Sequence, residues 1–231
     1  MFGSKKEYGV PIAVFDISSS SVGGAHALVK GDENHLPTIL ASARVDAPLQ
    51  EDLDMKRFVS DTTKNLEIVL SNLHKADLHK PSHIELVLAS PWYVSQTRTI
   101  SYEKEASFVC TKKLLNTLVE TEVERIVKDE LGRFGSFGKE GIVVEKQVSL
   151  IKLNGYATSK PFGKKAKKIE VYLAVTVVPK KIVDQFIDTL HRSYGARHIN
   201  ITTSPYATFV VARDYFNAAH ECVIIDVGEE V

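Results

Sequence analysis

The stretch from Ile12 to Lys30 combines residue types that could hold a phosphate group and a metal ion. Its first apolar run, Ile12 to Phe15, has the length of a buried strand and is followed directly by Asp16. Small side chains in a turn let backbone N–H groups converge on an anion. A carboxylate at a strand end can hold Mg²⁺ through water. The pattern therefore predicts a phosphate-binding turn with Asp16 as a magnesium ligand, lined by Ser18, Ser19, Ser20 and Ser21.

The same arrangement recurs near the C-terminus. An apolar segment from Glu221 to Ile225 is expected to form a strand that leads into Asp226, with Gly228 shortly after it. A simpler interpretation applies to the first stretch, in which serine and glycine merely form a turn and Asp16 caps a strand. The residues alone leave both interpretations open.

Hydrophobic periodicity predicts the elements that position these turns. Alternating or continuous apolar runs indicate strands, and apolar residues at three- and four-residue steps indicate helices. Strands are expected around 12–15, 25–29, 37–48, 83–89, 94–102, 142–153, 168–178 and 199–202, and helices over 52–78, 111–131, 179–194 and 205–216.

Local signals mark several ends of these elements. Asp52 or Asp54 is expected to cap the first helix, and Thr111 to cap the second. Gly195 is expected to end the third helix. The pair Asn154-Gly155 predicts a tight turn between strands. The order of elements predicts one domain formed by residues 1–93 plus 197–231 and an inserted α+β subdomain, 94–196.

Composition narrows the functional classes. The 231 residues carry 29 Lys and Arg and 29 Asp and Glu, so net charge gives no argument for a nucleic-acid partner. Cys110 and Cys222 lie far apart, which predicts a reducing compartment without disulfides. No apolar run reaches the roughly 18 residues that span a bilayer. We expect a cytoplasmic protein that reaches a membrane only through other proteins.

Other candidate sites have simpler explanations. His79 and His83 flank Lys80-Pro81, which cannot continue a helix, so a zinc site there is disfavoured. Trp92 is expected in the core. The densest basic run is either a solvated loop or a patch for an acidic partner or phosphorylated surface, and comprises Lys160, Lys164, Lys165, Lys167 and Lys168.

Three motifs resemble those of the bacterial actin-like proteins of the FtsA and PilM type. Asp16-Ile17-Ser18-Ser19-Ser20 is similar to their first phosphate loop, D-I-G-T/S-S. Asp226-Val227-Gly228-Glu229-Glu230-Val231 is similar to the second loop, D-I-G-G-G-T-T-D. Ser204-Pro205-Tyr206-Ala207-Thr208 looks like their E-P-L-A-S-A helix. The insertion 94–196 resembles subdomain 1C of FtsA, which has an SHS2 fold.

The resemblance implies an α/β protein with an actin-like (ribonuclease H-like) mixed-sheet subdomain and an inserted α+β SHS2-like subdomain. It implies a scaffold protein that assembles a membrane-associated cell-division or type IV pilus complex, with protein partners and self-association into filaments. ATP and Mg²⁺ would bind between two halves, of which this chain would be the first. Asp16 and Asp226 would hold Mg²⁺ through water. A weak ATPase activity is expected of the full-length form and none of the first half alone.

The sequence departs from the family pattern at three places, and the first two departures favour an alternative. Ser18 replaces a glycine, Glu229-Glu230 bring two negative charges to the second loop, and Ser204 replaces an acidic residue. The alternative is a degenerate, nucleotide-independent adaptor that binds protein partners through 94–196. A third interpretation, a sugar- or acid-kinase relative, is disfavoured by the SHS2-like insertion.

Overall fold

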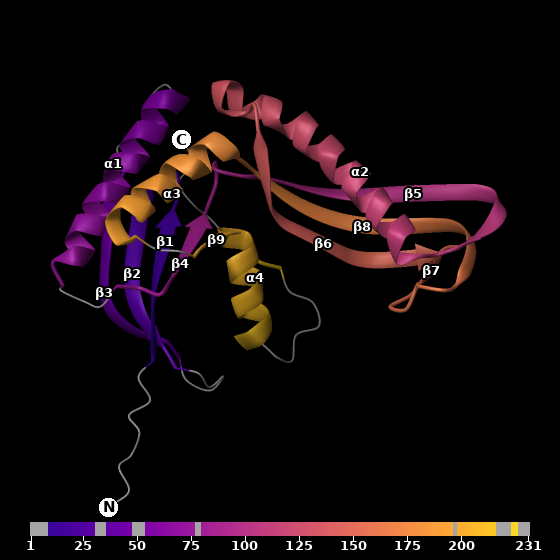
Figure 1. Ribbon diagram of the computed structural model, residues 1–231, viewed down its shortest axis with the longest axis horizontal. Coiled ribbons are helices and arrows are strands. Elements are labelled where there is room, and N and C mark those ends of the chain that lie inside the picture. The colour runs from indigo at the N-terminus through magenta and orange to yellow at the C-terminus, as the bar shows by residue number, and fades with distance from the viewer. Residues whose placement is uncertain are drawn as a thin grey trace, which may run out of the picture. The chain divides into compact units, whose positions relative to one another are not determined.

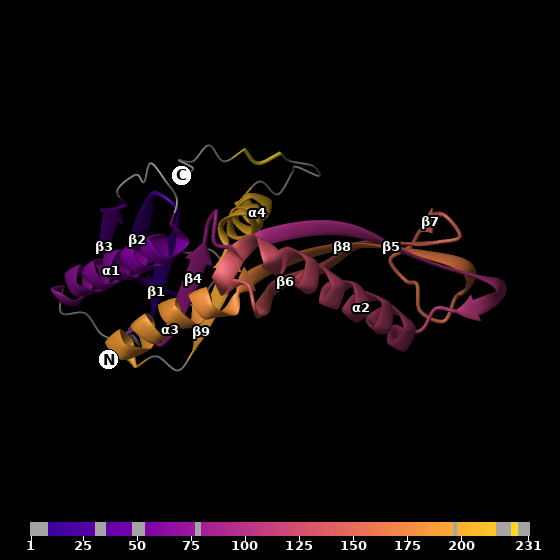
Figure 2. The ribbon, with the colours of Figure 1, turned by 90° about the horizontal axis from the view of Figure 1, so that it is seen from above.

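The computed structural model describes residues 9–30, 36–47, 54–76, 80–195, 198–215 and 223–225. The chain divides into two compact units (Figures 1 and 2). Unit 1 comprises Met1–Trp92 and Ile182–Val231, and unit 2 comprises Tyr93–Lys181. No helix in the described ranges is long and apolar enough to cross a membrane.

Unit 1 contains a five-stranded mixed sheet. Its order is β3-β2-β1-β4-β9. Strand β2 is antiparallel to β1 and β3, and strand β4 is parallel to β1 and β9. This is the predicted mixed-sheet arrangement. The strands are β1 (Val10–Ile17), β2 (Ser21–Val29), β3 (Thr38–Asp46), β4 (His83–Leu88) and β9 (Ile199–Thr203).

One face of this sheet is packed under two helices, α1 (Met55–His74) and α3 (Lys180–Tyr194), which lie side by side in Figures 1 and 2. Residues alternate along β1 and β4, so that every second side chain points to the helices. The fully buried residues of these two strands are Ala13, Phe15, Ile17, Ile84, Leu86 and Leu88. A further helix, α4 (Ser204–Tyr215), contacts β4 and β9.

Unit 2 is a four-stranded antiparallel sheet with one long helix against it (Figure 1). The order is β5-β8-β6-β7, formed by β5 (Val94–Val109), β8 (Lys165–Pro179), β6 (Gly141–Leu153) and β7 (Tyr156–Ala157). Helix α2 (Lys112–Leu131) is followed by a 3₁₀ segment, η1 (Gly132–Phe137). Every second residue of β8 from Ile169 to Val177 is buried in the core with α2.

Most of the predicted element ends are confirmed. The Asp54 carboxylate accepts hydrogen bonds from the backbone N–H groups of Lys56 (2.8 Å) and Arg57 (3.1 Å) and so caps α1. Thr111 accepts from the Leu114 N–H at 3.1 Å and caps α2. Gly195, with φ +62°, donates its N–H to the carbonyl of His191 and ends α3.

The structure places helix α3 differently from the sequence prediction. We expected it in the insertion, with a boundary at residue 196, but from Ile182 onward it belongs to unit 1. Phe186 meets the edge of the Trp92 ring at 5.4 Å, and Tyr194 lies 6.1 Å from Phe15. Periodicity identifies the apolar face of a helix but not the core that this face covers.

The structure also differs from the prediction of a strand over 221–225, as far as these residues are described. Val223, Ile224 and Ile225 have no regular secondary structure and pair with none of the described strands. An apolar segment becomes a buried strand only when a neighbouring strand satisfies its backbone groups. Glu221, Cys222 and Asp226 lie outside the described residues.

A buried histidine–tyrosine contact links β2 to α3. Nε2 of His26 lies 2.7 Å from the Tyr194 hydroxyl, and the His74 ring meets the Tyr194 ring edge-on at 5.0 Å. Burial lowers the pKa of His26, and the nearby His74 lowers this pKa further. Burial raises the pKa of Tyr194 to about 12. The fold therefore holds a neutral imidazole against a neutral phenol.

This contact makes unit 1 sensitive to acid. The unfolded chain protonates His26 near pH 6.5 while the folded chain resists protonation, so stability is full above pH 6.5 and falls as the pH drops toward the lowered pKa. We expect the urea midpoint to fall between pH 7.5 and pH 5, and His26→Gln to reduce that fall. The control is His191→Gln, which removes an exposed histidine. An equal reduction in both variants would contradict the assignment.

Gly24 lies where the sheet and α1 approach each other closely. A Cβ at this position would lie 2.7 Å from the Val69 side chain and 2.9 Å from the Phe15 ring. Gly24→Ala is therefore expected to lower the free energy of unfolding by about 1–3 kcal/mol, measured by urea denaturation. Gly23→Ala is the matched control, because its Cβ would meet only the flexible end of Arg44. Similar losses in the two variants would refute this packing argument.

Candidate functional site

The predicted phosphate-binding turn lies at the carboxyl ends of two parallel strands. Residues 18–20 connect β1 to β2, whose first residue is Ser21, and the next strand in the sheet, β4, ends beside them. The N–H of Ala89, just after β4, donates to the carbonyl of Ile17 at 2.9 Å. Ligand sites in open α/β sheets commonly lie at such carboxyl ends. The phosphate-binding role of this turn stays a prediction.

The turn closes on itself through Ser18. The Ser18 N–H donates to the Ser21 carbonyl (3.0 Å), and the Ser21 N–H donates to Ser18 Oγ (3.1 Å). The Ser18 hydroxyl also donates to the Ser21 carbonyl at 3.0 Å. The N–H groups at both ends of the turn thus donate to acceptors within the turn. The Ser19 and Ser21 side chains are buried. Ser18 provides the acceptor that closes the turn. It occupies the position of a glycine in the first phosphate-loop motif with which the sequence was compared.

Trp92 supports the turn from the core. Its indole N–H donates to the Ser18 carbonyl at 3.3 Å. Its ring is fully buried, stacks on Phe58 at 4.7 Å with an interplanar angle of 6°, and meets the edge of Phe186. The core role predicted for Trp92 is confirmed. The structure adds that this side chain also holds the serine turn.

Arg44 reaches into the site from β3. The register aligns Asp16 with Gly23 and Gly23 with Arg44, so that these residues form one row across three strands. Arg44 Nη2 lies 3.1 Å from a carboxylate oxygen of Asp16, and Nη1 donates to Ser21 Oγ at 2.6 Å. A Cβ on Gly23 would lie 2.8 Å from Nη2. Glycine at position 23 leaves the space through which the guanidinium crosses the strand.

This contact places a protein cation at the carboxylate predicted to bind Mg²⁺. The Arg44 and Asp16 side chains are 55% and 39% exposed. An ion pair this exposed contributes only about 0–1 kcal/mol, so a ligand or a metal could displace Arg44. Sequence reasoning missed Arg44 because it lies 28 residues from Asp16. The sequence indicates only that Arg44 belongs to a strand with alternating exposure. The register of the three strands is needed to place it beside Asp16.

The remaining predicted site residues belong to the second loop. Asp226 and Gly228 lie outside the described residues, as does His79. His83 Nε2 instead lies 2.6 Å from a carboxylate oxygen of Glu85. The described part of the chain contains no group of three or more His, Cys, Asp or Glu side chains that could hold a metal. Cys110 is buried, and burial raises the pKa of its thiol, which opposes a nucleophilic role.

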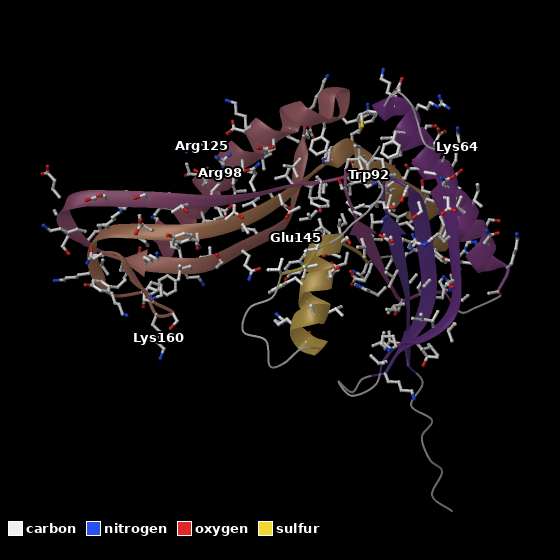
Figure 3. All side chains as sticks on the ribbon, turned by 180° about the vertical axis from the view of Figure 1, so that it is seen from behind. Lys64, Trp92, Arg98, Arg125, Glu145 and Lys160 are labelled. Carbon is white, nitrogen blue, oxygen red and sulfur yellow. The ribbon has the colours of Figure 1, made fainter. Side chains whose placement is uncertain are left out.

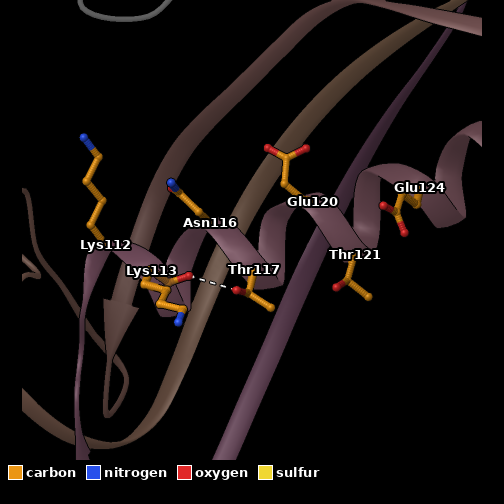
Figure 4. A pocket seen from close by; sticks show the side chains of 7 residues that line it. All are labelled: Lys112, Lys113, Asn116, Thr117, Glu120, Thr121 and Glu124. Carbon is orange, nitrogen blue, oxygen red and sulfur yellow. Dashed lines mark hydrogen bonds between the residues drawn. The ribbon is translucent and has the colours of Figure 1, made fainter.

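A shallow concavity lies along the outer side of α2 (Figure 4). All of its lining residues come from this one helix, and the hydroxyl of Thr117 donates to the carbonyl of Lys113 within the helix. Ligand sites usually combine polar groups from several elements around an apolar lining. We therefore assign no ligand to it. The lining residues are Lys112, Lys113, Asn116, Thr117, Glu120, Thr121 and Glu124.

Comparison with known proteins finds similarity in structure. No protein-family model and no curated protein matches the chain. The solved structure of the "PilM-PilN type IV pilus biogenesis complex" is similar over 90% of this chain and 51% of that chain, with 15% identity and a TM-score of 0.51. The chain therefore spans about half the length of the structure it matches.

Two further solved structures are similar to a smaller degree. One is the cytoplasmic domain of EpsL, an inner membrane component of the type II secretion system of Vibrio cholerae, with 11% identity and a TM-score of 0.37 over 82% of this chain and 57% of that chain. The other is a protein from Bacteroides thetaiotaomicron with an actin-like ATPase fold and unknown function, with 10% identity and a TM-score of 0.42 over 92% and 60%.

These comparisons concern the fold alone. The predicted fold class is confirmed: the chain is an α/β protein with an actin-like fold, and its five-stranded sheet has the expected mixed order. The closer kinship with FtsA, the SHS2 character of the insertion and the status of the chain as a first half stay predictions. So do the roles of the phosphate-loop residues.

The hydrogen bond from the Ser21 N–H to Ser18 Oγ yields a test of the turn. Ser18→Ala leaves this N–H without its acceptor in a partly buried turn, which costs about 1–2 kcal/mol of unfolding free energy in a urea titration. Ser20→Ala is the control, since the described contact of Ser20 uses its backbone carbonyl. A neutral Ser18→Ala would show that the hydroxyl does not hold the turn.

Proposed function

We propose that this protein is an actin-fold scaffold that helps to assemble a membrane-associated complex of the cell-division or type IV pilus kind. The observation that carries the proposal is the fold shared over 90% of the chain with a structure named for a pilus biogenesis complex. Its partners would be proteins of that complex, with self-association into filaments. It would act in the cytoplasm, at the inner face of the membrane.

The nucleotide-dependent form of the proposal assigns the serine turn to a phosphate group. Asp16 would hold Mg²⁺ through water, and Ser18, Ser19, Ser20 and Ser21 would line the phosphate. Asp226 and Gly228 would complete the site from the second loop. ATP with Mg²⁺ would bind when the second half of the protein is present, and any ATPase activity would belong to that full-length form.

A second candidate is an adaptor that assembles partners without nucleotide. Two observations favour it. Arg44 already compensates the charge of Asp16. The N–H groups of Ser18 and Ser21 donate to acceptors within the turn and therefore do not point to a phosphate group. Glu229-Glu230 would add negative charge where phosphates would lie. In this form residues 94–196 would provide the partner surface.

Calorimetric titration of ATP, with and without Mg²⁺, separates the two forms. We expect the natural full-length protein to bind Mg-ATP saturably if the first form is correct. Asp16→Asn should then weaken binding by about 10- to 100-fold, the range found when a group that supports a metal site is removed. Asp46→Asn is the matched control, because Asp46 is an exposed carboxylate at the end of β3, opposite Ser21.

Each outcome has a distinct meaning. Binding that needs Mg²⁺ and Asp16 supports the metal-dependent form. Binding that is independent of Mg²⁺ and lost in Arg44→Gln would make Arg44 the phosphate-binding cation and overturn the metal role of Asp16. Absence of saturable binding overturns the nucleotide-dependent form and leaves the adaptor.

The scaffold role is tested separately in the native host. Deletion of the gene should abolish assembly of a membrane-associated machine, and the wild-type gene should restore it. Restoration by Asp16→Asn as well would select the adaptor. If the deletion leaves division, pili and secretion intact, the scaffold proposal is wrong whatever the calorimetry shows.

A further inference from the structure

The end of unit 2 that carries β7 combines exposed lysines with exposed apolar side chains. We call residues 154–168 the β7 tip. It contains the turn from β6 to β7 at Asn154-Gly155 and the loop from β7 to β8. Asn154, Gly155 and Gly163 have positive φ angles of 52°, 86° and 80°, so the backbone turns sharply at both places. Figure 3 shows Lys160 extending outward from this loop.

The β7 tip is uniformly basic. It holds five lysines and no acidic residue. Lys168 is paired with Glu170 at 3.2 Å and lies opposite Glu103 in the sheet, and Glu105 follows in the bulge of β5. The Lys164 ammonium donates to the Thr158 hydroxyl at 3.0 Å, a contact that brings no negative charge to the tip. Exposed cationic side chains therefore remain at Lys160, Lys164, Lys165 and Lys167.

Apolar side chains are exposed among these lysines. Tyr156 is 80% exposed and Phe162 is 52% exposed, and Val109, which pairs with Lys165 across the sheet, is 43% exposed. In the described part of unit 2 the only other large apolar side chain in this class is Val148. Tyr156 lies on the edge strand β7 and Phe162 lies in the loop after it, so both aromatic rings belong to the β7 tip. Exposed apolar side chains at one end of a domain can mark a surface for another molecule or a membrane.

The backbone holds these side chains outward. The Gly163 N–H donates to the Cys110 carbonyl (2.9 Å), and the Cys110 N–H donates to the Lys164 carbonyl (2.8 Å). The Asn154 side-chain oxygen accepts from the N–H groups of Lys167 and Lys168. Both parts of the tip are thus tied to the sheet. Exposure of Phe162 and Tyr156 is built into a fixed surface and is not the result of a loose loop.

We propose that the β7 tip docks on the surface of a membrane that contains anionic phospholipids. Lysines near such a surface are each attracted by about 1 kcal/mol, and aromatic rings settle at the level of the headgroups. The tip contains no arginine, whose planar fork suits a single carboxylate or phosphate, but several lysines, which act as separate point charges. This favours a diffuse anionic surface over a shaped acidic protein. The proposal is independent of the scaffold function.

Flotation of the 231-residue protein with lipid vesicles tests the proposal. Vesicles of phosphatidylcholine with phosphatidylglycerol should carry the protein upward at low salt, with binding that weakens as salt rises, and vesicles of phosphatidylcholine alone should not. Two variants remove the two features independently. Lys165→Glu with Lys167→Glu should lower the partition coefficient at least about 30-fold, from about 1 kcal/mol for each lysine. Tyr156→Ser with Phe162→Ser should lower it severalfold with the same salt dependence.

The matched control is Lys128→Glu with Lys139→Glu, which makes the same change in charge at exposed positions elsewhere in unit 2. It should bind vesicles nearly as well as the wild type. Urea midpoints of all variants show that folding is retained. The proposal is overturned if the wild type does not float with anionic vesicles, or if the control loses as much binding as the tip variant. If the tip variants keep vesicle binding but abolish complex assembly in cells, an acidic protein partner is assigned to the tip instead.

Discussion

Trp92 makes the contact on which unit 1 depends most. Its ring lies between Phe58 of α1 and Phe186 of α3, so a single side chain joins the two helices that cover the sheet. Its indole N–H reaches the carbonyl of Ser18. A buried aromatic ring with a polar group at one end can fill a core and satisfy a backbone group at its margin. The position of the serine turn is therefore set by the packing of the core beneath it.

Above that core, strand register determines the chemistry of the site. Residues in register on neighbouring strands point to the same face, so Asp16, Gly23 and Arg44 share a face although they come from three strands. Because position 23 has no side chain, the guanidinium of Arg44 can span the middle strand. A shift of one residue between β2 and β3 would turn Arg44 to the other face. The charge at the turn is thus a property of the sheet as much as of the turn.

The sequence predicted the parts of the molecule that depend on local chemistry. Asp54 and Thr111 cap helices because their side chains reach N–H groups two or three residues away, and the Asn154-Gly155 turn follows from the positive φ angles that these residues tolerate. Short apolar runs identified β1 and β4 as buried strands of the mixed sheet. What the sequence could not provide were pairings over long distances: Arg44 with Asp16, α3 with unit 1, and Val109 with Lys165. Each needs the register of a sheet or the choice between two cores, and neither is encoded within a short window.

The absence of a side chain at Gly23 limits the substitutions that this part of the sheet tolerates. The Cβ of an alanine there would lie 2.8 Å from Nη2 of Arg44 and would push the guanidinium away from the carboxylate. A different residue at position 16 would in turn leave Arg44 with only the Ser21 hydroxyl as its described partner in the turn. The three positions therefore depend on one another, and a substitution at any one of them changes the contacts that the other two can make. In variants of this protein, positions 16, 23 and 44 should be considered together, although they lie on three different strands.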